Sequence, residues 1–298
     1  MRVAYIINDA AFFVSHRLNL ALSILDKGGN VIVITGKNVN KKLENKAINI
    51  LKNNNIKHQC CLFSQGFKNP LFEIIGLLQV ILFLNFFKPT TVHSVTPKAN
   101  FMAIISLNFF KKVKLVMSVS GLGTMFTGKI NFKKKLFLFI YRLALKVSLS
   151  RISYNIIFQN YDDFNQFQCL IKIKTSNVRF VPGSGVDTKY LTPAKLNYKQ
   201  MNILLPARML YEKGVNDFIE AIKILKKRNI KGKFFLAGDT MSMNPSRIPK
   251  EKISSWVKEG IVEYLGHKDD MKSLYKKMSI VCLPSWREGF PKVLMEAA

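Results

Sequence analysis

The sequence predicts an α/β protein with two domains, each built on a parallel β-sheet. Short continuous apolar runs alternate along the chain with stretches of helical apolar spacing, which is the pattern of parallel strands covered by helices on both faces. The 298 residues suffice for two medium-sized domains. A polar, turn-rich stretch at 183–200 interrupts the alternation. We therefore expect two Rossmann-like domains, 1–190 and 191–298.

The first domain opens with the strand–helix–strand pattern of such a sheet. Apolar runs at 3–8 and 31–36 flank a helical stretch marked by Leu18, Leu22 and Leu25, and a Gly28-Gly29 turn precedes the second run. Four further strands are expected, at 90–95, 114–120, 155–160 and 178–183.

The second domain repeats this alternation. Its strands are expected at 202–208, 233–238, 261–266 and 279–284, and its helices at 215–228, 250–259 and 269–278.

Composition and charge narrow the class of protein. Hydrophobic residues make up 48% of the chain and charged residues 21%, which excludes a disordered chain, a collagen-like repeat and a small disulfide scaffold. The net charge is +28, with 26 Lys and Arg against 7 Asp and Glu in residues 1–190. This excess favours a polyanionic partner: nucleic acid, an anionic membrane surface or a phosphorylated substrate. Alternatively, the basic excess has no functional meaning and reflects the enrichment in Asn, Lys, Ile and Phe that is expected from a genome poor in G and C.

The four cysteines predict neither a disulfide framework nor a metal site. Cys60, Cys61, Cys169 and Cys282 show no CxxC spacing, and the adjacent pair is expected to be two buried thiols in a reducing compartment. The start of the chain lacks the apolar core and cleavage site of a signal peptide. We expect a cytoplasmic location.

Two apolar segments could contact a membrane. Residues 71–87 number only 17 and include Glu73, Gln79 and Asn85, so a buried or interfacial helix is favoured over a membrane span. Residues 132–151 combine six Lys and Arg with a Leu- and Phe-rich body. This pattern is typical of a basic amphipathic helix in the headgroup region of an anionic bilayer, the alternative being an ordinary surface helix.

The last stretch, PSWREGFPKVLMEAA, carries two carboxylates eight positions apart, Glu288 and Glu296. A loop bearing Glu288 is expected to lead into a helix that begins near Pro291. The backbone N–H groups of Lys292 and Val293 would then form an anion site at the helix start. Carboxylates beside such a site suit a ligand with both hydroxyls and phosphate. Taken alone, the spacing equally fits two unrelated surface glutamates.

A pair of basic residues supports the interpretation that Glu288 and Glu296 belong to a ligand site. Arg208 and Lys213 follow the strand expected at 202–208 and precede a helix. The carboxyl ends of parallel strands line the ligand crevice of an open sheet. A guanidinium and an ammonium placed there can converge on a diphosphate.

These motifs together resemble a known family. The segments VPGSGVD (181–187), LLPARMLYEKGVNDFIEA (204–221), FFLAGD (234–239) and YLGHKDDMKSLYKKMSIVCLPSWREGFPKVLMEAA (264–298) are similar to the C-terminal domain of the retaining glycosyltransferases of family four, which have the GT-B fold. The two glutamates with seven residues between them are its signature. The front half, with SHRLNLA (15–21) and SVSGLGTMFTG (118–128), is similar to members that build bacterial surface polysaccharides on a lipid carrier.

The resemblance implies roles for individual residues. Arg208 and Lys213 would neutralise the diphosphate of a nucleotide sugar, which requires neither a metal nor another cofactor. Glu288 would face the donor sugar, and Glu296 would accept hydrogen bonds from the ribose hydroxyls. The remaining donor contacts are implied for the backbone N–H groups of Gly289, Phe290, Lys292 and Val293. The catalytic set would be Arg208, Lys213 and Glu288.

The first domain departs from the family pattern. Ser120 and Gly121 occupy the place where many members carry a histidine near the reacting sugar, and the glycine-rich loop after the first strand is missing. His16 and Arg17 are candidates, with Ser120 and Gly121, for the acceptor site. For His16 the alternative is a cap or a surface residue.

The resulting hypothesis is a metal-independent retaining glycosyltransferase. It would move a sugar from a nucleotide diphosphate sugar to a polyprenyl-diphosphate-linked or lipopolysaccharide acceptor, in O-antigen, capsule or lipopolysaccharide biosynthesis. We expect it at the inner face of the cytoplasmic membrane, bound peripherally to the anionic surface.

Three alternatives stay open. Family members normally continue beyond the helix that carries Glu296, so the second domain is expected to be truncated, and an inactive remnant is one alternative. A nucleic-acid-binding protein is supported by the charge alone, with no recognisable module, so we expect no nucleic-acid partner. A sugar-nucleotide epimerase would share the architecture without the Arg208, Lys213, Glu288 and Glu296 set.

Overall fold

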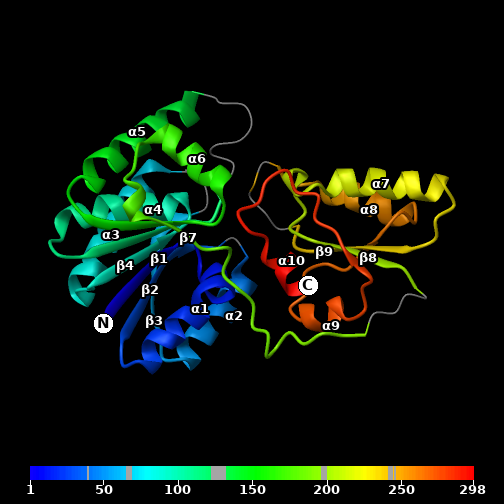
Figure 1. Ribbon diagram of the computed structural model, residues 1–298, viewed down its shortest axis with the longest axis horizontal. Helices are drawn as coiled ribbons and strands as arrows, with labels where there is room; N and C mark the ends of the chain where they lie inside the picture. Colours follow the sequence, from blue (N-terminus) through cyan, green and yellow to red (C-terminus); the bar gives the residue numbers. More distant parts are fainter. Residues whose placement is uncertain (39, 65–68, 122–131, 196–199, 241–243, 245) are drawn as a thin grey trace. The chain divides into compact units, whose positions relative to one another are not determined.

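The computed structural model divides into two compact units, Met1–Ser184 and Gly185–Ala298 (Figure 1). It describes the whole chain except residues 39, 65–68, 122–131, 196–199, 241–243 and 245, and it does not describe the side chains of 64 and 132–134. The boundary expected after residue 190 falls inside the second unit. Each unit is an α/β layer structure with its own parallel sheet, so the predicted fold class is confirmed.

The sheet of the first unit has seven parallel strands in the order β3-β2-β1-β4-β5-β6-β7. The strands are β1 (Arg2–Ile7), β2 (Asn30–Lys37), β3 (Lys57–Ser64), β4 (Thr91–Val95), β5 (Lys114–Val119), β6 (Ser153–Phe158) and β7 (Val178–Phe180). The order reverses between β1 and β4, as in doubly wound sheets.

Strand β3 was missed by the sequence analysis. It starts with Lys57, His58 and Gln59 and lies at the edge of the sheet, so it lacks the continuous apolar run of a central strand. Its two cysteines differ: Cys61 is buried and Cys60 is exposed. The expectation that both thiols are buried is therefore wrong, because successive side chains of a strand point to opposite faces.

Helices cover the two faces of this sheet in two groups. They are α1 (Ala10–Asp26), α2 (Lys41–Asn53), α3 (Pro70–Phe87), α4 (Pro97–Ser106), α5 (Phe132–Leu149) and α6 (Tyr161–Leu170). Helices α1 and α2 share a core with one face, and α3 to α6 share a core with the other. The change of face follows from the strand order, because right-handed crossovers in opposite directions along the sheet place their helices on opposite faces.

The second unit holds four parallel strands in the order β10-β9-β8-β11. The strands are β8 (Asn202–Pro206), β9 (Lys233–Ala237), β10 (Glu263–Tyr264) and β11 (Ile280–Val281), and the helices are α7 (Val215–Lys227), α8 (Lys250–Lys258), α9 (Met271–Tyr275) and α10 (Lys292–Ala297). Helices α7 and α8 cover one face, and α9 lies on the other. Strands β10 and β11 are shorter than the apolar runs that predicted them.

Candidate functional site

The carboxyl ends of β8 and β9 approach each other closely and place Arg208 at the edge of the sheet. The N–H of Ala207 donates to Ala237 O at 2.9 Å, and that of Met209 donates to Asp239 O at 3.0 Å. Gly238 has φ +156°, and a Cβ atom there would lie 1.8 Å from Ala207 O, so only glycine fits. The guanidinium of Arg208 is exposed and pairs with no carboxylate in the described part of the chain.

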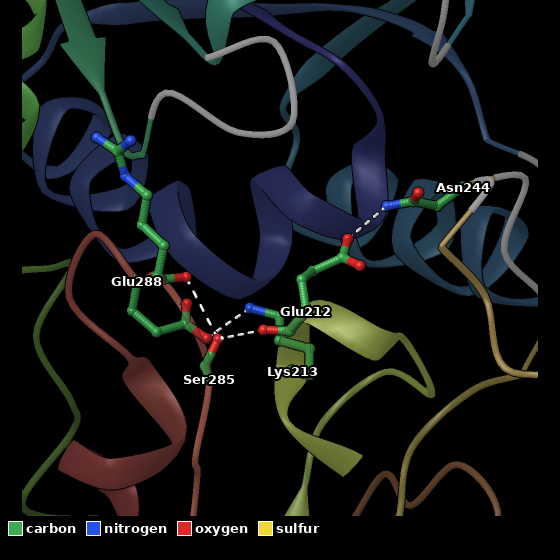
Figure 2. A network of polar contacts seen from close by, with 6 residues as sticks. Glu212, Lys213, Asn244, Ser285 and Glu288 are labelled. Carbon is green, nitrogen blue, oxygen red and sulfur yellow. Dashed lines mark hydrogen bonds and ion pairs between the residues drawn. The ribbon is translucent and has the colours of Figure 1, made fainter. Parts of the chain in front are cut away.

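Lys213 and Glu288 form an ion pair at this edge (Figure 2). Lys213 ends the short 3₁₀ helix η4 (Tyr211–Lys213), and Glu288 lies in the loop between β11 and α10. Lys213 Nζ lies 2.5 Å from Glu288 Oε1, and the two side chains are 21% and 25% exposed. The structure thus brings together the basic residue and the carboxylate that the sequence placed on separate segments.

Close contacts between backbone groups, together with one hydrogen bond from a serine hydroxyl, hold the loop that carries Glu288 against η4. Gly214 adopts φ +71° at the start of α7, and a Cβ atom there would lie 1.9 Å from Pro284 O. The Ser285 hydroxyl donates to Glu212 O at 3.1 Å, and the Trp286 N–H donates to the same oxygen at 3.0 Å. The Lys213–Glu288 distance is therefore set by backbone packing as well as by charge.

Glu212 lies in η4 beside Lys213, and the sequence analysis did not single it out. Its Oε1 accepts a hydrogen bond from Asn244 Nδ2 at 2.8 Å, and its Oε2 is buried without a hydrogen-bond partner in the described chain (Figure 2). The contact joins η4 to the segment after β9. The sequence carried no signal for it, since 32 positions separate the two residues.

Glu296 is held by two neighbours. It lies in α10, where Lys292 Nζ is 3.2 Å from its Oε1, and the Tyr275 hydroxyl donates to its Oε2 at 3.3 Å. Burial raises the pKa of Tyr275, and the charge of Glu296 raises it further, so the tyrosine remains a protonated donor. Tyr275 comes from α9, and nothing in the sequence pointed to it.

The remaining expected donor contacts lie between these two glutamates. Gly289 is half-buried, Phe290 is exposed, and α10 begins at Lys292 directly after Pro291, so that Lys292 and Val293 form its first turn. The predicted loop followed by a helix start is thus present. Their roles toward a donor stay predictions.

In the first unit, α1 carries both His16 and Arg17. The His16 ring stacks on Phe12 with centroids 4.2 Å apart, and its Nδ1 lies 3.2 Å from Phe12 O. Arg17 is buried and donates to His16 O at 2.8 Å.

Arg17 belongs to a polar cluster beneath α1 that the sequence analysis missed. The cluster contains Tyr5, His93 and Ser118, and His93 Nε2 lies 2.9 Å from Ser118 Oγ. Burial lowers the pKa of His93 to about 3, and the nearby Arg17 charge adds to the shift. Burial also lowers the pKa of Arg17. These groups come from α1, β1, β4 and β5, far apart in the sequence.

Ser120 and Gly121 follow β5 directly and are half-buried, and Gly121 has φ +100°. The motif that contains them runs on through 122–128, which lies outside the described residues. Among the residues that are described, no three His, Cys, Asp or Glu side chains are grouped to hold a metal ion.

The arrangement in the second unit suits a ligand that carries both phosphates and hydroxyls. Arg208 and Lys213 are cations at the carboxyl edge of the sheet, where open α/β sheets bind ligands. Glu288 lies on the adjoining loop and Glu296 on the helix that follows it, and both carboxylates can accept hydrogen bonds from hydroxyl groups. Such an edge can bind phosphate through its cations and hydroxyl groups through its carboxylates.

The known proteins to which this chain is similar include glycosyltransferases. The family described as "Glycosyl transferases group 1" matches residues 200–298. The N,N'-diacetylbacillosaminyl-diphospho-undecaprenol alpha-1,3-N-acetylgalactosaminyltransferase of Campylobacter jejuni is 25% identical over 311 residues, which cover all of this chain and 78% of that protein. The capsular polysaccharide biosynthesis glycosyltransferase CapM of Staphylococcus aureus is 23% identical, covering 90% of this chain and 68% of its own length.

Among solved structures, the Anabaena protein HepE (Alr3699) in complex with UDP-glucose matches with a TM-score of 0.71 at 15% identity. The match covers all of this chain and 78% of that one. At this identity the likeness concerns the fold alone. The chain has the GT-B fold, its residues 200–298 match the group 1 glycosyltransferases, and over its length it is distantly similar to enzymes of lipid-linked glycan and capsule synthesis.

Proposed function

We propose that this chain transfers a sugar, with retention of anomeric configuration, from a nucleotide diphosphate sugar to a lipid-linked saccharide acceptor in the synthesis of a bacterial surface polysaccharide. The polyprenyl-diphosphate-linked or lipopolysaccharide acceptor would be met at the inner face of the cytoplasmic membrane. The observation that carries the proposal is the Lys213–Glu288 pair with Arg208 and Glu296 on neighbouring segments of one sheet edge.

The chemistry of the transfer assigns a task to each group. When the bond from the sugar to the diphosphate breaks, negative charge develops on the leaving diphosphate. Arg208 and Lys213 stabilise this charge, and groups placed before the reaction starts do so without reorganisation. The acceptor hydroxyl then attacks the oxocarbenium-like sugar from the face that the diphosphate leaves, and the hydroxyl proton passes to an oxygen of the departing diphosphate. Glu288 accepts hydrogen bonds from the donor sugar and Glu296 from the ribose.

The acceptor class is supported by the relatives. The Campylobacter enzyme carries an undecaprenol-diphosphate-linked saccharide in its name, and the alignment with it covers all of this chain. The basic first unit, with 25 Lys and Arg against 6 Asp and Glu in residues 1–184, suits an acceptor that is itself anionic.

The proposal is tested first at the donor site. The melting temperature of the purified chain is measured with UDP, with GDP and without nucleotide, since a ligand that binds only the folded state raises it. We expect one nucleotide to raise the melting temperature, and Arg208→Ala to abolish the rise. Arg228→Ala, which removes an exposed arginine at the end of α7, is the matched control and should keep it.

Transfer is then followed with a radiolabelled nucleotide sugar and a polyprenyl-diphosphate-linked saccharide. Label is expected in the lipid phase, and the anomeric configuration of the product is expected to match that of the donor. A donor site that binds nucleotide without any transfer would contradict the proposed activity and favour a binding remnant. A cooperative melt unaffected by either nucleotide would contradict the donor site itself.

A further inference from the structure

Helix α3 turns an uncharged apolar face toward solvent. Six of its side chains are between 49% and 74% exposed: Leu71, Phe72, Ile74, Leu78, Leu82 and Phe86. By length and composition it is the one helix of the described residues that could cross a membrane. A surface helix of a soluble domain normally places charged residues on this face. An apolar face of this extent marks a site of interaction.

The opposite face of α3 is fixed to the sheet. Val80 and Leu84 are fully buried, and a Cβ atom on Gly76 would lie 3.0 Å from the backbone of Leu62 in β3. Gln79 Oε1 accepts a hydrogen bond from the Leu62 N–H at 2.7 Å. The only charged residue of the helix, Glu73, pairs with Lys98 at 2.6 Å. The helix is thus an integral part of the layer, with one face buried in the protein and the other unpartnered.

Helix α5 extends this surface and adds charge to it. Helix α4 packs against both α3 and α5, so the three helices form one layer (Figure 1). The exposed side chains of α5 include five apolar ones and three basic ones: Leu136, Phe139, Ile140, Leu143, Val147, Lys135, Arg142 and Lys146. At 100° per residue, the three basic side chains lie along one flank of the apolar stripe.

We propose that the outer faces of α3 and α5 form a docking surface for an anionic phospholipid bilayer. The apolar side chains of α3 and α5 enter the boundary between headgroups and acyl chains, and Arg142 and Lys146 contact the phosphates. The proposal rests on the proposed function only in that a lipid-linked acceptor resides in a bilayer.

The net charge of the first unit favours an anionic bilayer, rather than a second copy of the chain, as the partner of this surface. Residues 1–184 carry 25 − 6 = +19 charges, so two copies joined through this face would repel each other. An anionic bilayer complements that charge. Crossing of the membrane by α3 is disfavoured because the helix would have to leave the sheet and give up the Gln79 and Glu73 contacts.

The test measures binding of the full 298-residue chain to vesicles by flotation. Vesicles of phosphatidylethanolamine with phosphatidylglycerol are compared with vesicles of phosphatidylcholine alone. We expect binding to the anionic vesicles that weakens with added salt. Arg142→Gln with Lys146→Gln should lower the partition coefficient about thirtyfold. The control, Lys227→Gln with Lys231→Gln, removes two exposed charges of the second unit and should leave it within about twofold.

The apolar contribution is tested separately. Leu78→Gln with Leu82→Gln keeps the charge and should lower the partition coefficient at least about tenfold. Tryptophan fluorescence gives a separate measurement. Brominated lipid should quench the fluorescence of a tryptophan introduced by Leu82→Trp and should not quench that of one introduced by Ile224→Trp on α7. The two native tryptophans are common to both variants.

Each variant is also melted with and without nucleotide, which separates this proposal from the proposed function. Lost vesicle binding with an intact nucleotide shift supports the docking surface. Vesicle binding that persists while sugar transfer fails contradicts the proposed function alone. The docking surface is overturned if brominated lipid does not quench the fluorescence of the Leu82→Trp variant, or if the α3 variants bind vesicles as well as the parent chain does. It is also overturned if the surface instead forms a dimer that Leu78→Gln with Leu82→Gln dissociates. Extraction from vesicles only by detergent would overturn it in favour of a spanning helix.

Discussion

Lys213 Nζ and Glu288 Oε1 lie 2.5 Å apart although 75 positions separate the two residues. The cation that we assign to the donor diphosphate is therefore neutralised by a carboxylate of the chain itself. Under the proposed function, a donor diphosphate competes with Glu288 for Lys213, and its binding frees the Glu288 carboxylate to accept hydrogen bonds from the donor sugar.

This competition predicts opposite effects of Glu288→Gln on binding and on transfer. Removal of the carboxylate charge should tighten UDP binding by up to about fivefold, because a partly exposed ion pair contributes no more than that. Sugar transfer should fall about a hundredfold, as when a group that acts on the transition state is removed. Calorimetric titration and single-turnover transfer measure the two effects. Glu220→Gln, which breaks the exposed pair with Lys223, should change neither. Weaker UDP binding in Glu288→Gln would refute the competition.

Gly214 is predicted to be essential for holding the Glu288 loop. Gly214→Ala would place a Cβ atom 1.9 Å from Pro284 O at φ +71° and should destabilise the second unit by about 1–3 kcal/mol or more. Gly260→Ala is a matched control, since its φ of +64° is similar but nothing lies within 4 Å of the added atom. Urea unfolding of both variants isolates the contact with Pro284, and equal losses would exclude it.

Tyr275 is predicted to position Glu296. Tyr275→Phe removes the hydroxyl that donates to Glu296 Oε2 and should weaken UDP binding about two- to tenfold, the usual effect of one lost hydrogen bond. Binding is measured by titration calorimetry, with Tyr161→Phe, at an exposed site in the first unit, as the control. If Tyr275→Phe lowered the melting temperature without changing nucleotide affinity, the hydrogen bond would have a purely structural role.

Buried His93 predicts a loss of stability in acid. Burial lowers the pKa of His93 to about 3, against 6.5 for the free side chain, so the unfolded chain binds one more proton between these values. The free energy of unfolding should therefore fall as the pH is lowered from 6.5 toward 3, by up to about 1.4 kcal/mol per pH unit. The neutral ring is held among Arg17, Tyr5 and Ser118, none of which can compensate a positive charge.

Denaturant unfolding at several pH values checks this prediction. His93→Gln should flatten the dependence below pH 6.5 relative to the parent chain. The same slope in His93→Gln as in the parent chain would assign the acid sensitivity to other groups.

The alternation of apolar runs was sufficient to predict most strands and the α/β class, because strands buried on both faces are continuously apolar. It failed at β3, where Lys57, His58 and Gln59 occupy an edge that only the sheet order reveals. The sequence overestimated the lengths of the two-residue strands β10 and β11, because apolar residues such as Ile261 and Val262 are buried without strand pairing.

By itself, the sequence determined the fold class, the resemblance to the group 1 glycosyltransferases and the segments that carry the candidate site, since these depend on local periodicity and on motifs within single segments. Only the tertiary structure decided which groups meet: Glu288 with Lys213, Tyr275 with Glu296, and Arg17 with His93. The physical reason is that each contact joins segments distant along the chain, and their approach is set by strand order and by close backbone packing such as that of Gly214 on Pro284.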